Sequence, residues 1–326
     1  MSTPETNLSE AAGVAAALTP PVSGVASRSV PQTLVVLIRR EFWEHRALWT
    51  TPLIVAAVLL ATAIPIHFGR ITIGAHWEEL ANGDNSRNMF ALMLWLQTIP
   101  QYLVMTIVVA FYLQDCLYQE RKDRSILFWK SLPVSDAATV ISKLLVAVVV
   151  APLFVYLTAI VTGLLSHGIW AAGAASKALP NLATVWDTLA WLKVQALMLY
   201  GLLVAMVWFV PFAAFLLFVS AWARKNVFLW TTLPPVIAII AERVAFGTRY
   251  VADLLEYRSW TGFWNAVFGP LNPENAVHGR VVSLAELFDN VPMAKVFLNI
   301  DVWLGLAVAA ALVFGAIRIR RYRDDT

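Results

Sequence analysis

Residues 120–136 read ERKDRSILFWKSLPVSD and separate two long apolar runs, at 90–113 and 144–165. Charges of alternating sign open this segment and favour a solvated helix end. Four large apolar residues follow, and Pro133 is expected to end a short helix after them. The Ser-Asp pair at the end of the segment is expected to cap the next helix. The segment is therefore predicted to lie outside a membrane and to join two membrane-spanning helices.

Apolar residues dominate the 326-residue chain, which is 59% hydrophobic and 14% charged, whereas soluble domains carry about 25% charge. A transmembrane helix needs about 20 mostly apolar residues. The sequence therefore predicts an all-α, multi-pass membrane protein with six spans, at about 49–66, 90–113, 144–165, 194–219, 227–241 and 302–317. The fifth span contains Pro234–Pro235, which removes backbone donors and predicts a kink, a feature that is tolerated where neighbouring helices bury it.

Two further segments flank this core. Residues 1–31 contain few large apolar groups and are predicted to be a disordered tail, so that the membrane domain covers 32–326. Residues 32–49 predict an amphipathic helix lying in the headgroup layer, with a simple extension of the first span as the alternative. Its apolar stripe consists of Leu34, Ile38, Phe42, His45 and Trp49, and its polar side of Arg39, Arg40, Glu44 and Arg46. Between the last two spans, 283–291 and 293–299 predict short helices around an outer loop.

Basic residues predict the orientation. The side that would hold both termini carries 15 Lys and Arg over 94 residues, and the other side carries 9 over 111. Cytoplasmic loops carry the excess of Lys and Arg in membrane proteins. Both termini are therefore expected to be cytoplasmic, in the inner (cytoplasmic) membrane.

The sequence gives no sign of chemistry within the chain. It contains no Gly-Lys pair, so the phosphate-cradling pattern G-x-x-x-x-G-K-[ST] is absent, and any energy for work must come from another protein. No His spacing is typical of a metal site, and no G-x-S-x-G nucleophile pattern occurs. We therefore predict no catalytic residue, no metal and no cofactor in this chain.

The stretch FYLQDCLYQERKDRSILFWKSLPVSDAATVISKLL at 111–145 resembles the corresponding loop of ABC-2-type permeases, the membrane subunits of ABC exporters. The shared pattern is E-R-x-x-x-[ST] after the second span, a short apolar helix, then L-P-[VI]-S and a Lys before the third span. The REFWEHRALWTTPLI stretch at 40–54, the six-span layout and the long loop before the last span extend the resemblance over most of the chain.

The resemblance implies that this segment is a coupling helix seated in a groove of a separate ABC ATPase subunit. The implied coupling residues are Glu120, Arg121, Arg124, Ile126, Leu127, Phe128, Trp129 and Leu132. Two ATPase copies would bind ATP and Mg, and a second permease copy or a paralogue would complete a dimer in the lipid bilayer. No nucleic acid partner is expected. The candidate pathway residues at the permease dimer interface are Gln97, Gln101, Thr231 and Thr232.

Two other functions stay open. A membrane-anchored enzyme would need its site in the outer loop, where only the scattered Ser259, His278 and Asp289 are available. A non-transporting membrane scaffold shares the composition. The sequence does not indicate a transported substrate, because one fold serves many substrates.

The predicted topology can be tested by thiol labelling of intact cells in a Cys116→Ser background. Cysteines at Asn82, Asn181 and Asn275 are expected to react with an impermeant reagent, because they lie in the less basic loops. Cysteines at Ser125 and Asn226 are expected to stay unlabelled until the cells are lysed. Labelling of Ser125→Cys in intact cells would reverse the orientation.

Overall fold

The computed structural model describes residues 30–67, 85–131, 134–176, 188–268 and 293–322. Within these ranges every regular element is a helix, and six helices are long and apolar enough to cross a membrane. The chain is thus an all-α protein of the multi-pass membrane class, as its sequence predicted. Residues 1–29 of the predicted tail at 1–31, and the predicted helix at 283–291, lie outside the described residues. The last two residues of that tail, Val30 and Pro31, are helical and begin α2, so the end of the tail was predicted two residues too late.

The helices, in chain order, are α2 (Val30–Glu44), α3 (Ala47–His67), α5 (Asn85–Lys122), α6 (Ser125–Ser131), α7 (Asp136–Leu145), the π-helical turn η1 (Val146–Val150), α8 (Ala151–Ser176), α9 (Thr188–Trp208), α10 (Val210–Trp222), α11 (Val227–Phe246), α12 (Tyr250–Glu256), the π-helical turn η2 (Tyr257–Thr261), α13 (Gly262–Phe268), α15 (Met293–Leu298) and α16 (Ile300–Tyr322).

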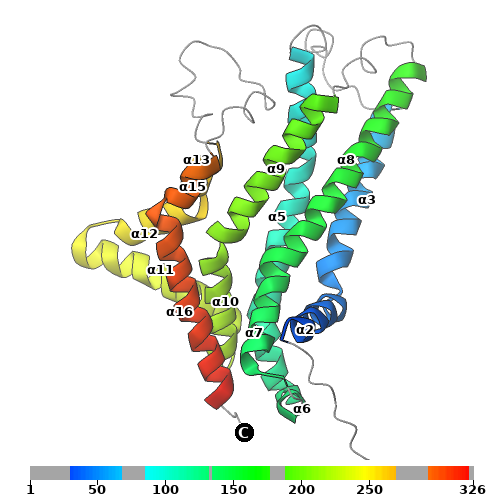
Figure 1. Cartoon of the computed structure of the whole chain (residues 1–326). Coiled ribbons are helices and arrows are strands. Elements are labelled where there is room, and N and C mark those ends of the chain that lie inside the picture. The colour runs from blue at the N-terminus through cyan, green and yellow to red at the C-terminus, as the bar shows by residue number, and fades with distance from the viewer. Residues whose placement is uncertain (1–29, 68–84, 132–133, 177–187, 269–292, 323–326) are drawn as a thin grey trace, which may run out of the picture.

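Helix α5 is the centre of the bundle. It packs against α3 and α8 on one side and against α10 on the other, and α10 in turn packs against α16 (Figure 1). The main core joins Leu113 and Leu117 of α5 to Val155 of α8, Leu217 of α10 and Ala316 of α16. Several buried positions are alanines, and small residues let helix backbones approach closely where lipid removes the hydrophobic drive. Both α2 and the end of α16 lie at the same end of the bundle (Figure 1).

The predicted fourth span, 194–219, is two helices rather than one. Helix α9 ends at Trp208, Phe209 adopts φ −92° and ψ 0°, and α10 starts at Val210 with a proline in its first turn. Pro211 has no N–H to donate to the preceding turn, so the ladder of backbone hydrogen bonds is interrupted there. By contrast, α11 runs without interruption through Pro234 and Pro235 and extends beyond the predicted end of the fifth span.

Helix α11 leans away from α10 toward the side of the bundle, and α12 turns back (Figure 1). Of its own residues α11 buries only Val227 and Thr231, so most of its apolar surface faces away from the described protein. The chain returns through η2 and α13, and α15 forms the short helix that the sequence predicted at 293–299.

Arg258 of η2 links the returning segment to the break between α9 and α10. Its guanidinium donates to the carbonyl of Trp208 at 3.1 Å and to the carbonyl of Asp301 at 3.0 Å. It also lies 4.5 Å from the centroid of the Trp208 ring, and the indole N–H donates back to the Arg258 carbonyl at 2.7 Å. Gly305 of α16 leaves the space that the guanidinium fills, because a Cβ there would overlap Arg258 Nη2.

We therefore expect Gly305→Ala to lower the thermal unfolding midpoint of the purified protein, since overpacking commonly costs about 1–3 kcal/mol. Gly168→Ala in α8 is the matched control, because nothing lies within 4 Å of a Cβ at that position. The control should leave the midpoint unchanged or raise it, as alanine is the better helix former. Equal midpoints for both variants would show that Arg258 moves aside without cost.

Candidate functional site

Five charged residues meet at the end of the bundle that carries α2 and α6, and we call them the ionic cluster. They are Glu41 of α2, Glu120 of α5, Asp136 and Lys143 of α7, and Arg320 of α16. Glu41, Glu120, Lys143 and Arg320 are buried, with exposed fractions of 1%, 8%, 2% and 4%. Burying charge is costly unless each ion has a partner, so the geometry of the pairs decides whether the cluster is stable.

Lys143 is the central cation. Its Nζ donates to both carboxylate oxygens of Glu41 at 2.9 Å. It also lies 3.0 Å from Oε1 of Glu120 and forms an ion pair with it, without a hydrogen bond. Arg320 pairs with the other oxygen of Glu120 and donates through Nε to Asp136 at 3.1 Å. The cluster thus ties α2, α5, α7 and α16 together through charge-assisted contacts.

Glu41 has three more partners. Arg40 donates to its Oε1 at 2.9 Å, the Tyr112 hydroxyl donates to Oε2 at 3.2 Å, and His45 Nε2 lies 3.5 Å from Oε2. Burial alone would raise the pKa of Glu41. The hydrogen bond from His45 and the charges of Lys143 and Arg40 outweigh it and lower the pKa from its ordinary value of 4.5 to about 2. Glu41 is therefore ionised at neutral pH.

The sequence near Glu41 and Asp136 explains where these two carboxylates lie in their helices. Glu41 follows Leu37 by four residues, so both lie on the face of α2 that is buried against the bundle. The Ser135 hydroxyl accepts from the Ala138 N–H at 3.1 Å and caps α7, as one of the two predicted caps. This cap places Asp136 in the first turn, where the helix dipole favours a negative charge.

Helix α6 lies next to the cluster and is the short helix that the sequence predicted. The Phe128 ring is 59% exposed and meets the Trp129 ring edge-on, with centroids 5.1 Å apart. The Arg40 guanidinium stacks over the Trp129 ring at 3.6 Å from its centroid. Because Arg40 also donates to Glu41, α6 is connected to the ionic cluster through two consecutive contacts.

The eight residues implied for coupling fall into three groups: residues held by contacts within the chain, residues in or just before α6 that are exposed or partly buried, and residues outside the described part of the chain. Glu120 belongs to the ionic cluster, and Arg121 donates to the carbonyls of Ser220 and Ala223 at the end of α10, at 2.6 and 2.8 Å. Both are thus held by contacts within the chain. Arg124 has a positive φ of 57° in the turn before α6 and is exposed. Ile126 and Trp129 are partly buried and Phe128 is exposed, whereas the Leu127 side chain and Leu132 lie outside the described residues.

The four candidate pathway residues are not brought together. Gln97 donates to the Ser166 hydroxyl, and Gln101 accepts from Thr158 at 3.4 Å, so both join α5 to α8. Thr231 of α11 donates to Gln114 of α5 at 3.3 Å. The Thr232 hydroxyl donates to the carbonyl of Phe228, one turn earlier in its own helix, at 2.8 Å. The two glutamines and Thr231 therefore mark separate helix contacts, whereas the hydrogen bond of Thr232 lies within α11.

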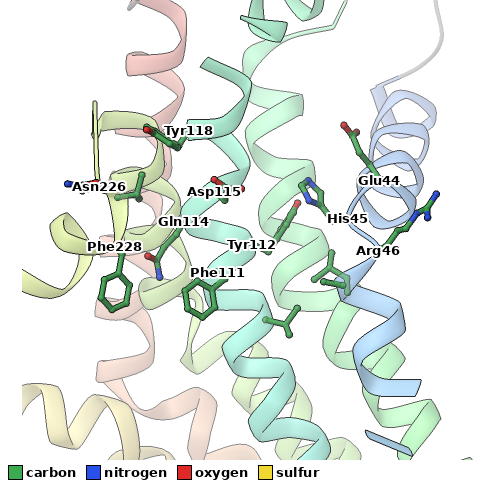
Figure 2. A pocket seen from close by; sticks show the side chains of 14 residues that line it. Glu44, His45, Arg46, Phe111, Tyr112, Gln114, Asp115, Tyr118, Asn226 and Phe228 are labelled. Atoms are coloured by element: carbon green, nitrogen blue, oxygen red, sulfur yellow. The ribbon is translucent and has the colours of Figure 1, made fainter. Parts of the chain in front are cut away.

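An open cleft of about 700 Å³ adjoins the ionic cluster. Figure 2 shows its walls: Glu44, His45 and Arg46 come from the junction of α2 and α3, Phe111, Tyr112, Gln114, Asp115 and Tyr118 from α5, and Asn226 and Phe228 from the start of α11. His45 links the two features, because its ring lies edge-on to Tyr112 at 4.7 Å and its Nε2 faces Glu41.

The described residues contain no group of three His, Cys, Asp or Glu that could hold a metal ion. The Ser259 hydroxyl donates to the Glu256 carbonyl at 3.3 Å, and the two other residues considered for an outer-loop enzyme, His278 and Asp289, lie outside the described residues.

Sequence analysis missed the ionic cluster as a unit. It assigned Glu120 to a partner surface and left Glu41 without a role. One signal was present: Glu41 lies three residues after Ile38 and one before Phe42, on the apolar side of an amphipathic helix. A carboxylate in that position needs a buried cation, but the helix that supplies Lys143 lies 102 residues further along the chain.

Replacement of Glu41 by Gln should destabilise the purified protein by about 3 kcal/mol at neutral pH, because it leaves the buried Lys143 undercompensated. The pKa of Glu41 is depressed in the folded state, so its stabilisation is complete above about pH 4.5 and is lost as the pH falls toward about 2. The difference in unfolding free energy between wild type and variant should therefore shrink over that range. Denaturation at several pH values measures it.

Glu44→Gln is the matched control, since Glu44 is 57% exposed and pairs with Arg40 on the surface at 3.1 Å. Exposed pairs contribute about 0–1 kcal/mol, so this variant should stay close to wild type. If both variants lower the free energy of unfolding equally, the buried Glu41–Lys143 pair contributes no more stability than the exposed Arg40–Glu44 pair.

Comparison with known proteins adds nothing to this geometry. No protein-family model, curated protein or solved structure matches the chain, so its function has to be inferred from the ionic cluster, α6 and the cleft themselves.

Proposed function

We propose that the chain is the membrane-spanning permease subunit of an ATP-driven ABC transporter and exports a substrate across the cytoplasmic membrane. A separate ATPase subunit would bind ATP and Mg and dock on α6. The observation that carries this proposal is α6 itself: a short helix outside the spans, with one exposed aromatic ring and a connection through Arg40 to the ionic cluster.

The surface of α6 suits a protein partner. Phe128 is exposed among charged neighbours, including exposed Lys122, Arg124 and Lys130. An exposed apolar group with a polar rim commonly marks an interaction site, and a buried aromatic anchor often dominates the binding energy. The chain has no phosphate-cradling motif of its own, which is why the partner is proposed to be the ATPase.

The contacts of α6 also supply a route for force. A displacement of α6 acts on Arg40 through the stacked Trp129, and Arg40 donates to Glu41. Glu41 holds Lys143 of α7, and Glu120 and Arg320 extend the same network to α5 and α16. Motion of one small helix would therefore be passed to four helices, each of which meets the cluster through a charged side chain.

The proposed assembly contains two ATPase copies and a second permease copy or a paralogue. A non-transporting scaffold remains the second candidate, since it could present the same exposed Phe128. The two functions differ in the partner: the transporter requires a protein with a nucleotide site at α6, and the scaffold does not.

A photo-crosslinking amino acid at position 128 distinguishes them in cells that express the full chain. The expected crosslinked partner is a protein whose sequence contains G-x-x-x-x-G-K-[ST], identified by mass spectrometry. The same amino acid at Phe314 of α16 is the control, because that ring is equally exposed, at 58%, but lies within a span. Crosslinks from position 128 only to lipid, or to proteins without a nucleotide site, would contradict the proposal.

Phe128→Ala should then weaken co-purification of the ATPase about thirtyfold, since loss of an anchor commonly costs about 2 kcal/mol. The thermal midpoint of the permease alone should not change, because the ring's described contact is with Trp129. Trp129→Ala should alter both properties, as it also removes the stacking under Arg40. A Phe128→Ala chain that unfolds would place this ring in the permease core instead.

A further inference from the structure

A small cavity lies where α5, α8 and α9 meet, toward the end of the bundle opposite α6 (Figure 1). Its volume is about 20 Å³. The small residues Ala159 and Gly163 of α8 lie at its wall, one helical turn apart. Its polar lining consists of Thr98 and Tyr102 of α5, Tyr156 of α8 and Gln195 of α9. Three helices thus enclose a space with polar walls.

The cavity lies within the membrane-spanning part of the chain. Helices α5, α8 and α9 contain the candidate spans Leu96–Lys122, Asp136–Ile169 and Trp191–Trp208, and every residue that lines the cavity falls within one of them. Tyr102 comes six residues after Leu96, about 9 Å along the helix. Lipid tails offer no hydrogen bonds, so a polar group at this depth needs a partner in the protein or an ordered water.

The Tyr102 hydroxyl lacks a partner in the protein. It is buried and forms no hydrogen bond with any residue that the structure describes, although a hydroxyl can donate one and accept two. The Nε2 atom of Gln101 is also buried and unpaired, but Gln101 does not line the cavity. Tyr102 is therefore the residue that presents an unpaired polar atom to this space.

The hydroxyls of Tyr102 and Tyr156 lie near each other. Both line the same small cavity, and the two groups are close enough to interact electrostatically. The hydrogen bond from Thr158 to Gln101, at 3.4 Å, joins α5 to α8 at the same level. The Tyr156 hydroxyl donates to the Gln195 carbonyl at 3.0 Å, so its oxygen remains able to accept a hydrogen bond.

We propose that this cavity binds one water molecule, which accepts a hydrogen bond from the Tyr102 hydroxyl and donates one to the Tyr156 oxygen. A buried water needs a volume of about 10–15 Å³ and about three polar partners. The cavity has the volume, and Thr98 and Gln195 lie at its wall as further partners. The water joins α5 to α8, and the hydrogen bond from Tyr156 to Gln195 continues this connection to α9.

A sodium ion would fit the volume of the cavity but not its charge. No carboxylate lines the cavity, and its polar groups are neutral. A cation in apolar surroundings without an anion costs far more free energy than a neutral water does. The inference concerns this cavity alone and requires neither the proposed ATPase nor a transported substrate.

A structure of the purified full chain, determined by electron cryomicroscopy in a lipid nanodisc, tests the proposal directly. At a resolution that shows ordered surface waters, we expect a density peak in the cavity, about 2.5–3.0 Å from the Tyr102 hydroxyl oxygen. An empty cavity in such a map would overturn the proposal. So would a direct hydrogen bond from Tyr102 to another group of the protein.

Tyr102→Phe tests the same water through the sign of its effect on the thermal unfolding midpoint. With water bound, the change removes one hydrogen bond and should lower the midpoint by about 2 °C in a chain of this length. With an empty cavity, the change removes an unpaired buried hydroxyl, so an unchanged or higher midpoint would contradict the proposal. Tyr250→Phe is the matched control and should leave the midpoint unchanged, because Tyr250 is 75% exposed and lies outside the cavity.

Replacement of sodium by choline at constant ionic strength separates a bound water from a bound cation. The midpoint of the wild type should be the same in both salts. A midpoint that rises with sodium in the wild type but not in Tyr102→Phe would assign the cavity to a cation and overturn the proposal. An equal rise in both chains would place the sodium elsewhere and leave water as the ligand of the cavity.

Discussion

The arrangement of this protein at one end depends on a single ammonium group held between two carboxylates. Lys143 donates to Glu41 and faces Glu120, and those three residues come from three different helices. Removing one member of a buried ion pair typically costs about 3–5 kcal/mol, whereas exchanging the whole set for apolar residues can be neutral. We therefore infer that the cluster mainly determines which helices pack together and in which register. Its net contribution to the free energy of folding is of less importance.

This constraint explains why α2 is attached to the bundle at all. Helix α2 exposes Val35, Val36 and Trp43. Its apolar residues can pack against lipid as well as against protein, so apolar contacts alone do not hold it to the bundle. Ile38 and Phe42 pack against the core, and Glu41 adds a contact that lipid cannot replace. The same helix carries Arg40 over Trp129 of α6. The pairing of Glu41 thus contributes, through Arg40, to the position of α6, which also contacts α5.

The break between α9 and α10, part-way along the bundle, uses a similar solution with different groups (Figure 1). Arg258 fills the break between α9 and α10 and donates to backbone carbonyls. Carbonyls freed at a helix break need donors in a membrane, where water is scarce. The end of the bundle near α2 and α6 is thus organised by ion pairs between helices, and the break between α9 and α10 by a cation that donates to the freed carbonyl of Trp208. Along the bundle, α5 packs mainly through apolar and small residues.

Local pattern and composition determined the class of this protein. Apolar runs of sufficient length predicted the six spans and the all-α fold. The charge cluster, the proline and the Ser-Asp pair predicted α6 and a cap at Ser135 or Asp136, because these signals act between residues close in sequence. The tertiary structure alone decided that Glu120 faces inward, that Arg121 caps α10, and that Phe128 stays exposed. Glu41 meets a lysine 102 residues away and Glu120 an arginine 200 residues away. The choice of partner for a buried charge depends on which distant helices pack together, and no local periodicity carries that information.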